Sequence, residues 1–119
     1  IMVPTGSVDP WSDKVLRAGM GAHFRLPLRD GLSWEEITPL LAGLTVRLAA
    51  AGSDVSYDDV DWTIPSALIV GGEARGAGRV AQQRADQLIS IPMANEVESL
   101  NAAVAGSVIL FEALRQRRA

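Results

Sequence analysis

A glycine-rich turn is the first feature of this chain whose residue types can hold a ligand. It runs from Gly71 to Gly78 after an apolar strand, and glycines there let a ligand approach backbone amides closely. The turn has neither the G-x-G-x-x-G spacing of a dinucleotide-binding turn nor the Gly-Lys-Ser/Thr ending of a phosphate-binding loop. Taken by itself, it is better explained by tight strand-to-helix geometry.

Two short segments downstream also combine apolar and hydrogen-bonding residues. Ile91-Pro92-Met93 ends an apolar run, and by itself it reads as a strand with a rigid exit. Ser99-Leu100-Asn101 precedes an almost uncharged stretch, and serine and asparagine are preferred at helix starts. Each segment therefore has a sufficient structural explanation when it is taken separately.

The order and spacing of the three segments resemble those of SpoU-type RNA ribose methyltransferases, part of the SPOUT class. Members carry Leu-x-x-Gly-x-Glu-x-x-Gly, then Ile-Pro-Met, then Ser-Leu-Asn and a long apolar helix ending in Glu-Ala-x-Arg. The matching segments are residues 68–76, 91–93, 99–101 and 112–115. Residues 8–27 also resemble the family's Asp-Pro-x-x-x-Lys-x-x-Arg-Ala-x-x-Gly-Ala-x-Phe-x-x-Pro segment, so the likeness covers nearly the whole chain.

The resemblance implies that S-adenosyl-L-methionine binds in a bent form, largely to backbone groups of these three loops. By the same resemblance, Glu73, Ser99 and Asn101 are the expected catalytic residues. The expected cofactor-binding residues are Gly71, Gly72, Gly76, Ile91, Pro92, Met93, Leu100 and Ala103.

The implied reaction moves a methyl group from the cofactor's sulfonium to a ribose 2′-hydroxyl of tRNA or rRNA. No metal is expected, because the leaving thioether is neutral and the enzyme needs only to align the groups and remove a proton. The family's catalytic arginine belongs to an earlier motif that this sequence does not contain. Arg17 matches a different family position, and His23, the one histidine, is better explained as structural than as a base.

The alternation of strands and helices predicts an α/β fold with a mostly parallel sheet and helices on both faces. The resemblance adds a trefoil knot of the SPOUT type. We expect strands at residues 1–3, 23–26, 45–50, 66–70 and 87–91. Helices are expected from Ser7 or Asp9 to Met20, from a capping box at Ser33, over residues 79–85 and from about residue 100 onward.

The terminal helix is apolar on several faces, which predicts a homodimer formed through it. We interpret residues 1–119 as one SPOUT domain that lacks its first strand or strands and any upstream RNA-binding domain. The closing Arg115-Gln116-Arg117-Arg118 segment can contact RNA phosphates or complement the helix dipole, and we favour the dipole.

Composition narrows the function classes further. The formal charge of −3 gives no general affinity for nucleic acid, and the absence of cysteine excludes thiolate metal sites and is compatible with a reducing cytoplasm. The apolar run over residues 100–114 is too short to span a membrane. The acidic loop over residues 52–63 is better read as solvated than as a metal site. We therefore expect a soluble, cytoplasmic protein without a metal.

Two alternatives stay open. The chain could be a catalytically inactive SPOUT module that acts in RNA binding or dimerisation. It could also be an unrelated doubly wound nucleotide-binding domain that uses the glycine turn for a phosphate, in which case phosphate compounds should compete for the site.

Overall fold

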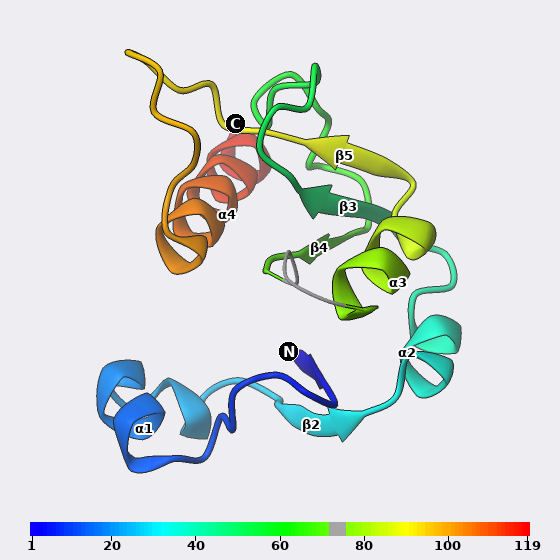
Figure 1. Cartoon of the computed structure of the whole chain (residues 1–119), viewed down its shortest axis with the longest axis vertical. Coiled ribbons are helices and arrows are strands. Elements are labelled where there is room, and N and C mark those ends of the chain that lie inside the picture. Colours follow the sequence, from blue (N-terminus) through cyan, green and yellow to red (C-terminus); the bar gives the residue numbers. More distant parts are fainter. Residues whose placement is uncertain (72–75) are drawn as a thin grey trace. The chain divides into compact units, whose positions relative to one another are not determined.

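The structure is a computed structural model that describes residues 1–71 and 76–119. It consists of two compact units, residues 1–42 and 43–119 (Figure 1). Among the helices within these ranges, none combines the length and the apolar character needed to traverse a lipid bilayer.

Unit 1 is built on two short parallel strands with helical segments between and after them. The strands are β1 (Met2–Pro4) and β2 (Arg29–Leu32). The helical segments are α1 (Asp13–Gly19), the 3₁₀ turn η1 (Ala22–Phe24) and α2 (Trp34–Leu40). The strand predicted at residues 1–3 is thus confirmed, shifted by one residue.

The start of α1 differs from the sequence expectation. Its N-cap is Ser12, whose hydroxyl accepts a hydrogen bond from the Val15 amide at 3.4 Å. Asp9, one of the two caps expected, instead accepts from the Trp11 amide at 2.9 Å and so shapes the preceding turn. The helix therefore begins later, because the local turn around Pro10 uses the earlier polar side chain.

The strand expected at residues 23–26 is absent, and this prediction was wrong. Residues 22–24 form η1, which follows Gly21 at a φ of 88°. His23 turns toward the preceding loop, where its Nε2 lies 2.6 Å from the Pro10 carbonyl and its ring packs on Trp11. These tertiary contacts outweigh the alternating pattern, and the strand forms later at β2. His23 contacts structural groups, in line with its structural interpretation.

The capping box that begins α2 is confirmed. The Glu36 amide donates to the Ser33 hydroxyl, and the Ser33 amide donates to the Glu36 carboxylate, both at 3.1 Å. The helix ends at Leu40, directly after Pro39, as expected for a residue that lacks the amide donor of its turn.

Unit 2 contains a three-stranded parallel sheet in the order β4-β3-β5 (Figure 1). Its strands are β3 (Thr45–Ala49), β4 (Ser66–Ile69) and β5 (Gln87–Ile89), and its helices are α3 (Gly76–Arg84) and α4 (Ala102–Arg118). In register, Leu48 pairs with Ile69 on one side and Leu88 on the other. The α/β class and the parallel pairing are confirmed, while α3 begins three residues earlier than the predicted Arg79.

The core of unit 2 lies between the sheet, α4 and the loop that joins β3 to β4. It is formed by Val60 and Trp62 of the loop, Ile89 of β5 and Ile109 of α4. Ile89 and Ile109 have no exposed surface, and Trp62 is 3% exposed. The acidic loop thus supplies two core residues rather than being a solvated connection along its whole length.

Candidate functional site

A cavity of about 320 Å³ opens where the carboxyl ends of the three unit 2 strands approach the start of α4. It is lined by Ala49, Ala50, Ala51, Val70, Gly71, Ile89, Ser90, Ile91, Met93, Glu98, Ser99, Leu100, Ala102, Ala105 and Ile109. Parallel strands end at one common edge, and ligands of open α/β sheets bind outside that edge. The cavity is therefore placed where the fold favours a ligand.

The three segments singled out in the sequence meet at this cavity. Of the expected cofactor-binding residues, Gly71, Ile91, Met93 and Leu100 line it, and so does Ser99 from the expected catalytic set. Gly71 has a φ of 89°, a conformation that glycine adopts without strain, so the chain can turn away from β4 at the cavity wall.

The remaining expected residues fall into three groups. Pro92 and Asn101 are absent from the cavity lining, and Ala103 lines a separate hollow on the outer side of α4. Gly76 is the first residue of α3. The expectations for Gly72 and Glu73 lie outside the described residues.

Asn101 has a defined structural task at the cavity edge. Its side-chain oxygen accepts hydrogen bonds from the amides of Ala103 at 2.9 Å and Val104 at 3.3 Å, which makes it the N-cap of α4. These contacts fix the point at which the loop carrying Ser99 and Leu100 becomes a helix. The family segment Ser-Leu-Asn thus ends at the cap of the helix.

Sequence reasoning missed part of the lining. The run Ala49-Ala50-Ala51 at the end of β3 contributes three small residues, and Ala105 contributes another from α4. Small side chains at the end of a buried strand leave room for a ligand, and this was the signal available in the sequence. Glu98 was also missed, although it directly precedes the Ser-Leu-Asn segment.

One wall of the cavity is held by serine hydroxyls. Ser90 donates to the Ser53 carbonyl at 2.7 Å, and Ser53 donates to the Leu88 carbonyl at 2.8 Å. The Ser90 amide also donates to the Val55 carbonyl at 2.9 Å. These bonds tie the end of β5 to the loop after β3, so the wall between them is defined before a ligand arrives.

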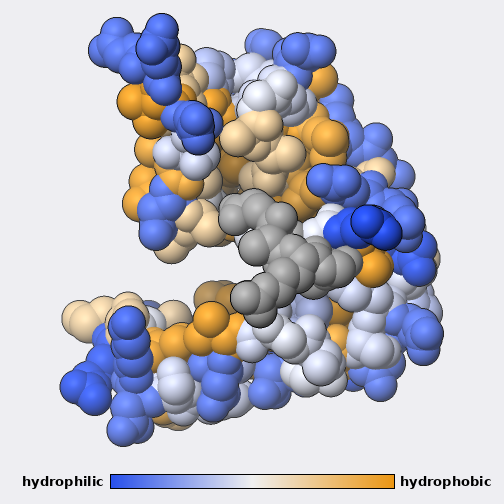
Figure 2. Space-filling view, in the orientation of Figure 1, coloured by the Kyte–Doolittle hydropathy of each residue, from blue (hydrophilic) through white to orange (hydrophobic). Residues whose placement is uncertain are grey.

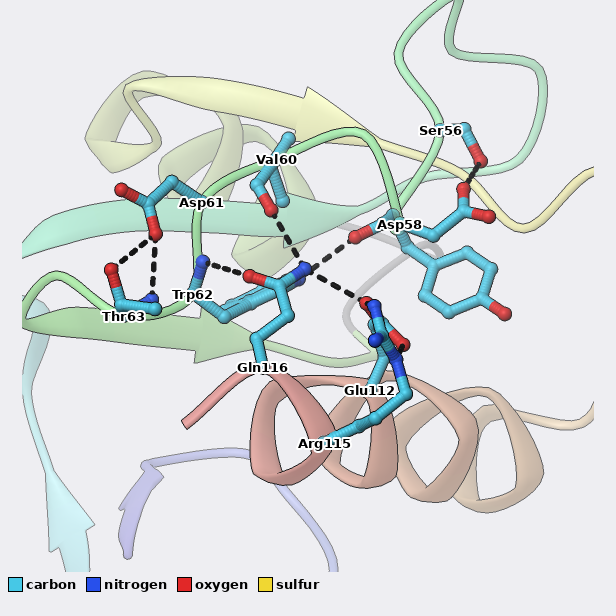
Figure 3. A network of polar contacts seen from close by, with 10 residues as sticks. Ser56, Asp58, Val60, Asp61, Trp62, Thr63, Glu112, Arg115 and Gln116 are labelled. Carbon is cyan, nitrogen blue, oxygen red and sulfur yellow. Dashed lines mark hydrogen bonds and ion pairs between the residues drawn. The ribbon is translucent and has the colours of Figure 1, made fainter. Parts of the chain in front are cut away.

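The far end of α4 is fixed to the same loop by Gln116 (Figure 3). The Gln116 side-chain amide donates to the Val60 carbonyl at 3.1 Å, and its oxygen accepts from the Trp62 amide at 2.8 Å. It also donates to Glu112 at 2.8 Å. We call this arrangement the Gln116 clamp. It holds the loop against the helix, and Ile109 of that helix lines the cavity.

Arg115 and Arg117 of the same helix also form hydrogen bonds. Two Arg115 nitrogens, Nε and Nη2, donate to Glu112 at 2.7 Å, and Arg117 donates to the Trp62 carbonyl at 2.8 Å. Hydrogen bonds from Arg115, and next from Gln116, lower the pKa of Glu112 to about 2. Gln116 and Arg117 therefore hold the helix and the loop together, a role that neither the phosphate nor the dipole interpretation anticipated.

Arg47 of β3 also holds the loop between β3 and β4 in place. It is 4% exposed and donates to the Ser66 hydroxyl at 2.9 Å and the Asp61 carbonyl at 3.0 Å. Its guanidinium lies 4.7 Å from the ring centroid of Trp62. Burial lowers the pKa of Arg47, while Asp61 acts in the opposite direction. The charge is accommodated by these contacts and is directed at structural groups.

The outer side of α4 is apolar and open. A hollow of about 620 Å³ is lined there by Tyr57, Ala103, Val104, Ser107, Val108, Phe111, Glu112 and Arg115. Phe111 is 72% exposed and Val104 is 49% exposed, and the space-filling view shows hydrophobic side chains over this helix (Figure 2). Exposed apolar area of this kind marks an interaction surface.

Metal ligands do not gather in the part of the chain that the structure describes: no group of three histidine, cysteine, aspartate or glutamate side chains could hold an ion there. Asp58 and Asp61 of the loop accept hydrogen bonds from neighbouring residues. Asp61, for example, accepts from both the amide and the hydroxyl of Thr63, and these bonds lower its pKa.

Comparison with known proteins assigns the family. The SpoU rRNA Methylase family profile matches residues 1–111. An uncharacterized tRNA/rRNA methyltransferase of Mycolicibacterium gilvum is 46% identical over 104 residues, covering 86% of this chain and 33% of that protein. The chain spans about a third of the length of the curated relatives that it matches first.

Solved structures agree with this match. The SpoU methyltransferase AviRb from Streptomyces viridochromogenes, in complex with the cofactor AdoMet, is 31% identical with a TM-score of 0.89, covering 98% of this chain and 49% of that chain. An RNA 2′-O ribose methyltransferase is 29% identical with a TM-score of 0.81, covering 99% and 46%. On the profile match and these likenesses together, the chain belongs to the SpoU rRNA methylase family.

Proposed function

We propose that this chain is the cofactor-binding part of an RNA methyltransferase that transfers a methyl group from S-adenosyl-L-methionine to a ribose 2′-hydroxyl of tRNA or rRNA. The observation that carries the proposal is the cavity in which three separate family segments meet at the carboxyl edge of the sheet. Support for the cofactor comes from the AdoMet-bound AviRb relative, and support for the ribose hydroxyl from the 2′-O methyltransferase relative.

The cavity chemistry suits an adenosyl thioether. Its walls include the apolar side chains of Ile89, Ile91, Leu100 and Ile109, against which an adenine can pack. Of the described residues, none that lines it carries a positive charge. Phosphate groups are held most strongly by positively charged side chains, so the described lining offers less support to the alternative of a phosphate-binding domain.

When bound, the cofactor supplies an electrophilic methyl group. The chain's own task is to hold the sulfonium and the ribose in line and to remove the hydroxyl proton. Ser99 lines the cavity, and Asn101 fixes the adjoining loop through its N-cap bonds, so we assign them to substrate positioning. Glu73 is proposed as the third member on the family resemblance.

We propose further that residues 1–119 form one SPOUT domain with a trefoil knot and helices on both faces of the sheet, acting in the cytoplasm with RNA-binding parts supplied elsewhere in the protein. A homodimer through α4 is proposed on the exposure of Leu110 (61%) and Phe111 (72%). These residues would be covered by the same face of a second copy.

Calorimetric titration with S-adenosylhomocysteine, with ATP and NAD as controls and light scattering for mass, tests the cavity assignment. We expect saturable binding of the homocysteine compound alone, by a dimer. The substitution Ala105→Leu, which fills the cavity, should abolish binding, whereas Ala119→Leu, at the exposed end of the same helix, lies outside the cavity and should retain binding. Equal binding by both variants would place the ligand elsewhere.

The reaction is tested by mass spectrometry of nucleosides from tRNA and rRNA of cells that carry or lack the gene for this chain. We expect the loss of one 2′-O-methylnucleoside. Loss of a base-methylated nucleoside would refute the ribose assignment. No change in any nucleoside would favour the inactive RNA-binding or dimerisation module.

A further inference from the structure

Of the described residues that line the cavity, one carries a charge. Among the described lining residues, Glu98 is the sole charged group, and the other polar side chains are the hydroxyls of Ser90 and Ser99. The Ser90 hydroxyl is already committed to the Ser53 carbonyl. Among the described lining residues, the electrostatic field that a ligand meets is therefore set mainly by one carboxylate.

Glu98 is also unengaged. Within residues 1–71 and 76–119, its carboxylate forms no hydrogen bond or ion pair, whereas Glu36 closes a capping box and Glu112 is held by Arg115. Glu98 is exposed in the loop that precedes α4. A carboxylate at a cavity wall without a protein partner is available to a cation on the ligand.

We infer that Glu98 is a specificity-determining residue that provides the counter-charge for a cationic group of the bound cofactor. This inference rests on the proposed function. S-adenosyl-L-methionine carries two cationic groups, the sulfonium and the amino-acid ammonium. S-adenosylhomocysteine keeps the ammonium and has a neutral thioether, and 5′-methylthioadenosine has neither cation.

If the group that Glu98 faces is the sulfonium, the attraction between them changes during the reaction. In methyl transfer the bond between methyl carbon and sulfur breaks, the electron pair stays on sulfur, and the new bond forms to the ribose oxygen as its proton leaves. The thioether product then no longer attracts Glu98, so the carboxylate would hold the reactant more tightly than the product.

The effect is moderate because the site is partly open to water. For two unit charges several ångströms apart at an effective dielectric constant between that of a protein surface and that of water, neutralising one of them should weaken binding about three- to tenfold. The loss should shrink as salt is added, because exposed charges are screened.

The test compares Glu98→Gln with Glu96→Gln by calorimetric titration of all three ligands at low and high salt. Glu96 is exposed in the same loop and is not part of the cavity lining, so its variant removes the same charge away from the site. We expect Glu96→Gln to bind each ligand as the unsubstituted chain does. Glutamine and glutamate are nearly the same size and shape, so both variants should fold, and circular dichroism checks this.

Two results support the inference and assign the cation. A loss confined to S-adenosyl-L-methionine identifies the sulfonium, and a loss shared by S-adenosylhomocysteine but not by methylthioadenosine identifies the ammonium. Equal losses for all three ligands, or losses no larger than those of Glu96→Gln, would overturn it. If the unsubstituted chain binds none of the three, the proposed function fails instead.

Discussion

Replacing Gln116 with alanine tests whether the Gln116 clamp holds α4 to the loop after β3. The side chain makes three hydrogen bonds, two of them to the backbone of Val60 and Trp62. Those residues are 8% and 3% exposed, so the freed amide and carbonyl have little access to water. With about 1–1.5 kcal/mol for each of the two buried backbone groups that lose their partner, and little from the bond to Glu112, we expect the unfolding free energy to fall by about 2–3 kcal/mol.

The assay is urea unfolding followed by tryptophan fluorescence, with thermal unfolding by circular dichroism alongside. Gln83→Ala is the matched control, because Gln83 is an exposed residue of α3, and it should change stability by less than about 0.5 kcal/mol. A Gln116→Ala variant as stable as this control would refute the clamp. The ligand affinity should fall with stability, since Ile109 links the clamped core to the cavity.

Three further results are expected. Gly106→Ala should raise the thermal midpoint through better helix propensity, because its new methyl group would lie 3.5 Å from Val70, an ordinary contact; a lower midpoint would contradict this. Gly19→Ala should lower the midpoint despite its helical position, because its methyl group would lie 2.8 Å from the His23 ring; unchanged stability would show that the ring moves freely. Glu112→Gln should be less stable than the unsubstituted chain at neutral pH, and urea titrations should show the gap closing as pH falls from about 4.5 to about 2, since the stabilising carboxylate has a folded-state pKa of about 2. A gap that is constant with pH would contradict that assignment.

Features that depend on a few neighbouring residues were predicted well. The capping box at Ser33 and the early end of α2 at Pro39 need only local hydrogen bonds and one missing donor. The parallel strands followed from apolar runs alternating with helical stretches. By contrast, residues 23–26 alternate like a strand, yet His23 packs on Trp11 and the segment becomes a 3₁₀ turn. Contact with a distant loop decided that conformation, and no local pattern encodes it.

The candidate site likewise combines residues that the sequence predicted with residues that only the tertiary structure identified. The order of the three family segments could be recognised in the sequence, which predicted that they form one site. The structure places one or two residues of each segment at the same cavity: Gly71, Ile91, Ser99 and Leu100. The sequence did not predict a counter-charge role for Glu98, since an exposed glutamate in a loop has no sequence signature. Its importance follows from the tertiary structure, in which the other described lining residues carry no charge.

The sequence by itself therefore determined the family, the class of fold and the three segments that build the cavity, because these depend on residue order, periodicity and short motifs. The tertiary structure decided which residues support them. Gln116, Arg117 and Arg47 hold a loop whose backbone groups have few strand partners, across separations of up to 56 residues. A buried amide or carbonyl must find a partner wherever the folded chain provides one, and only packing in three dimensions determines which side chain that is.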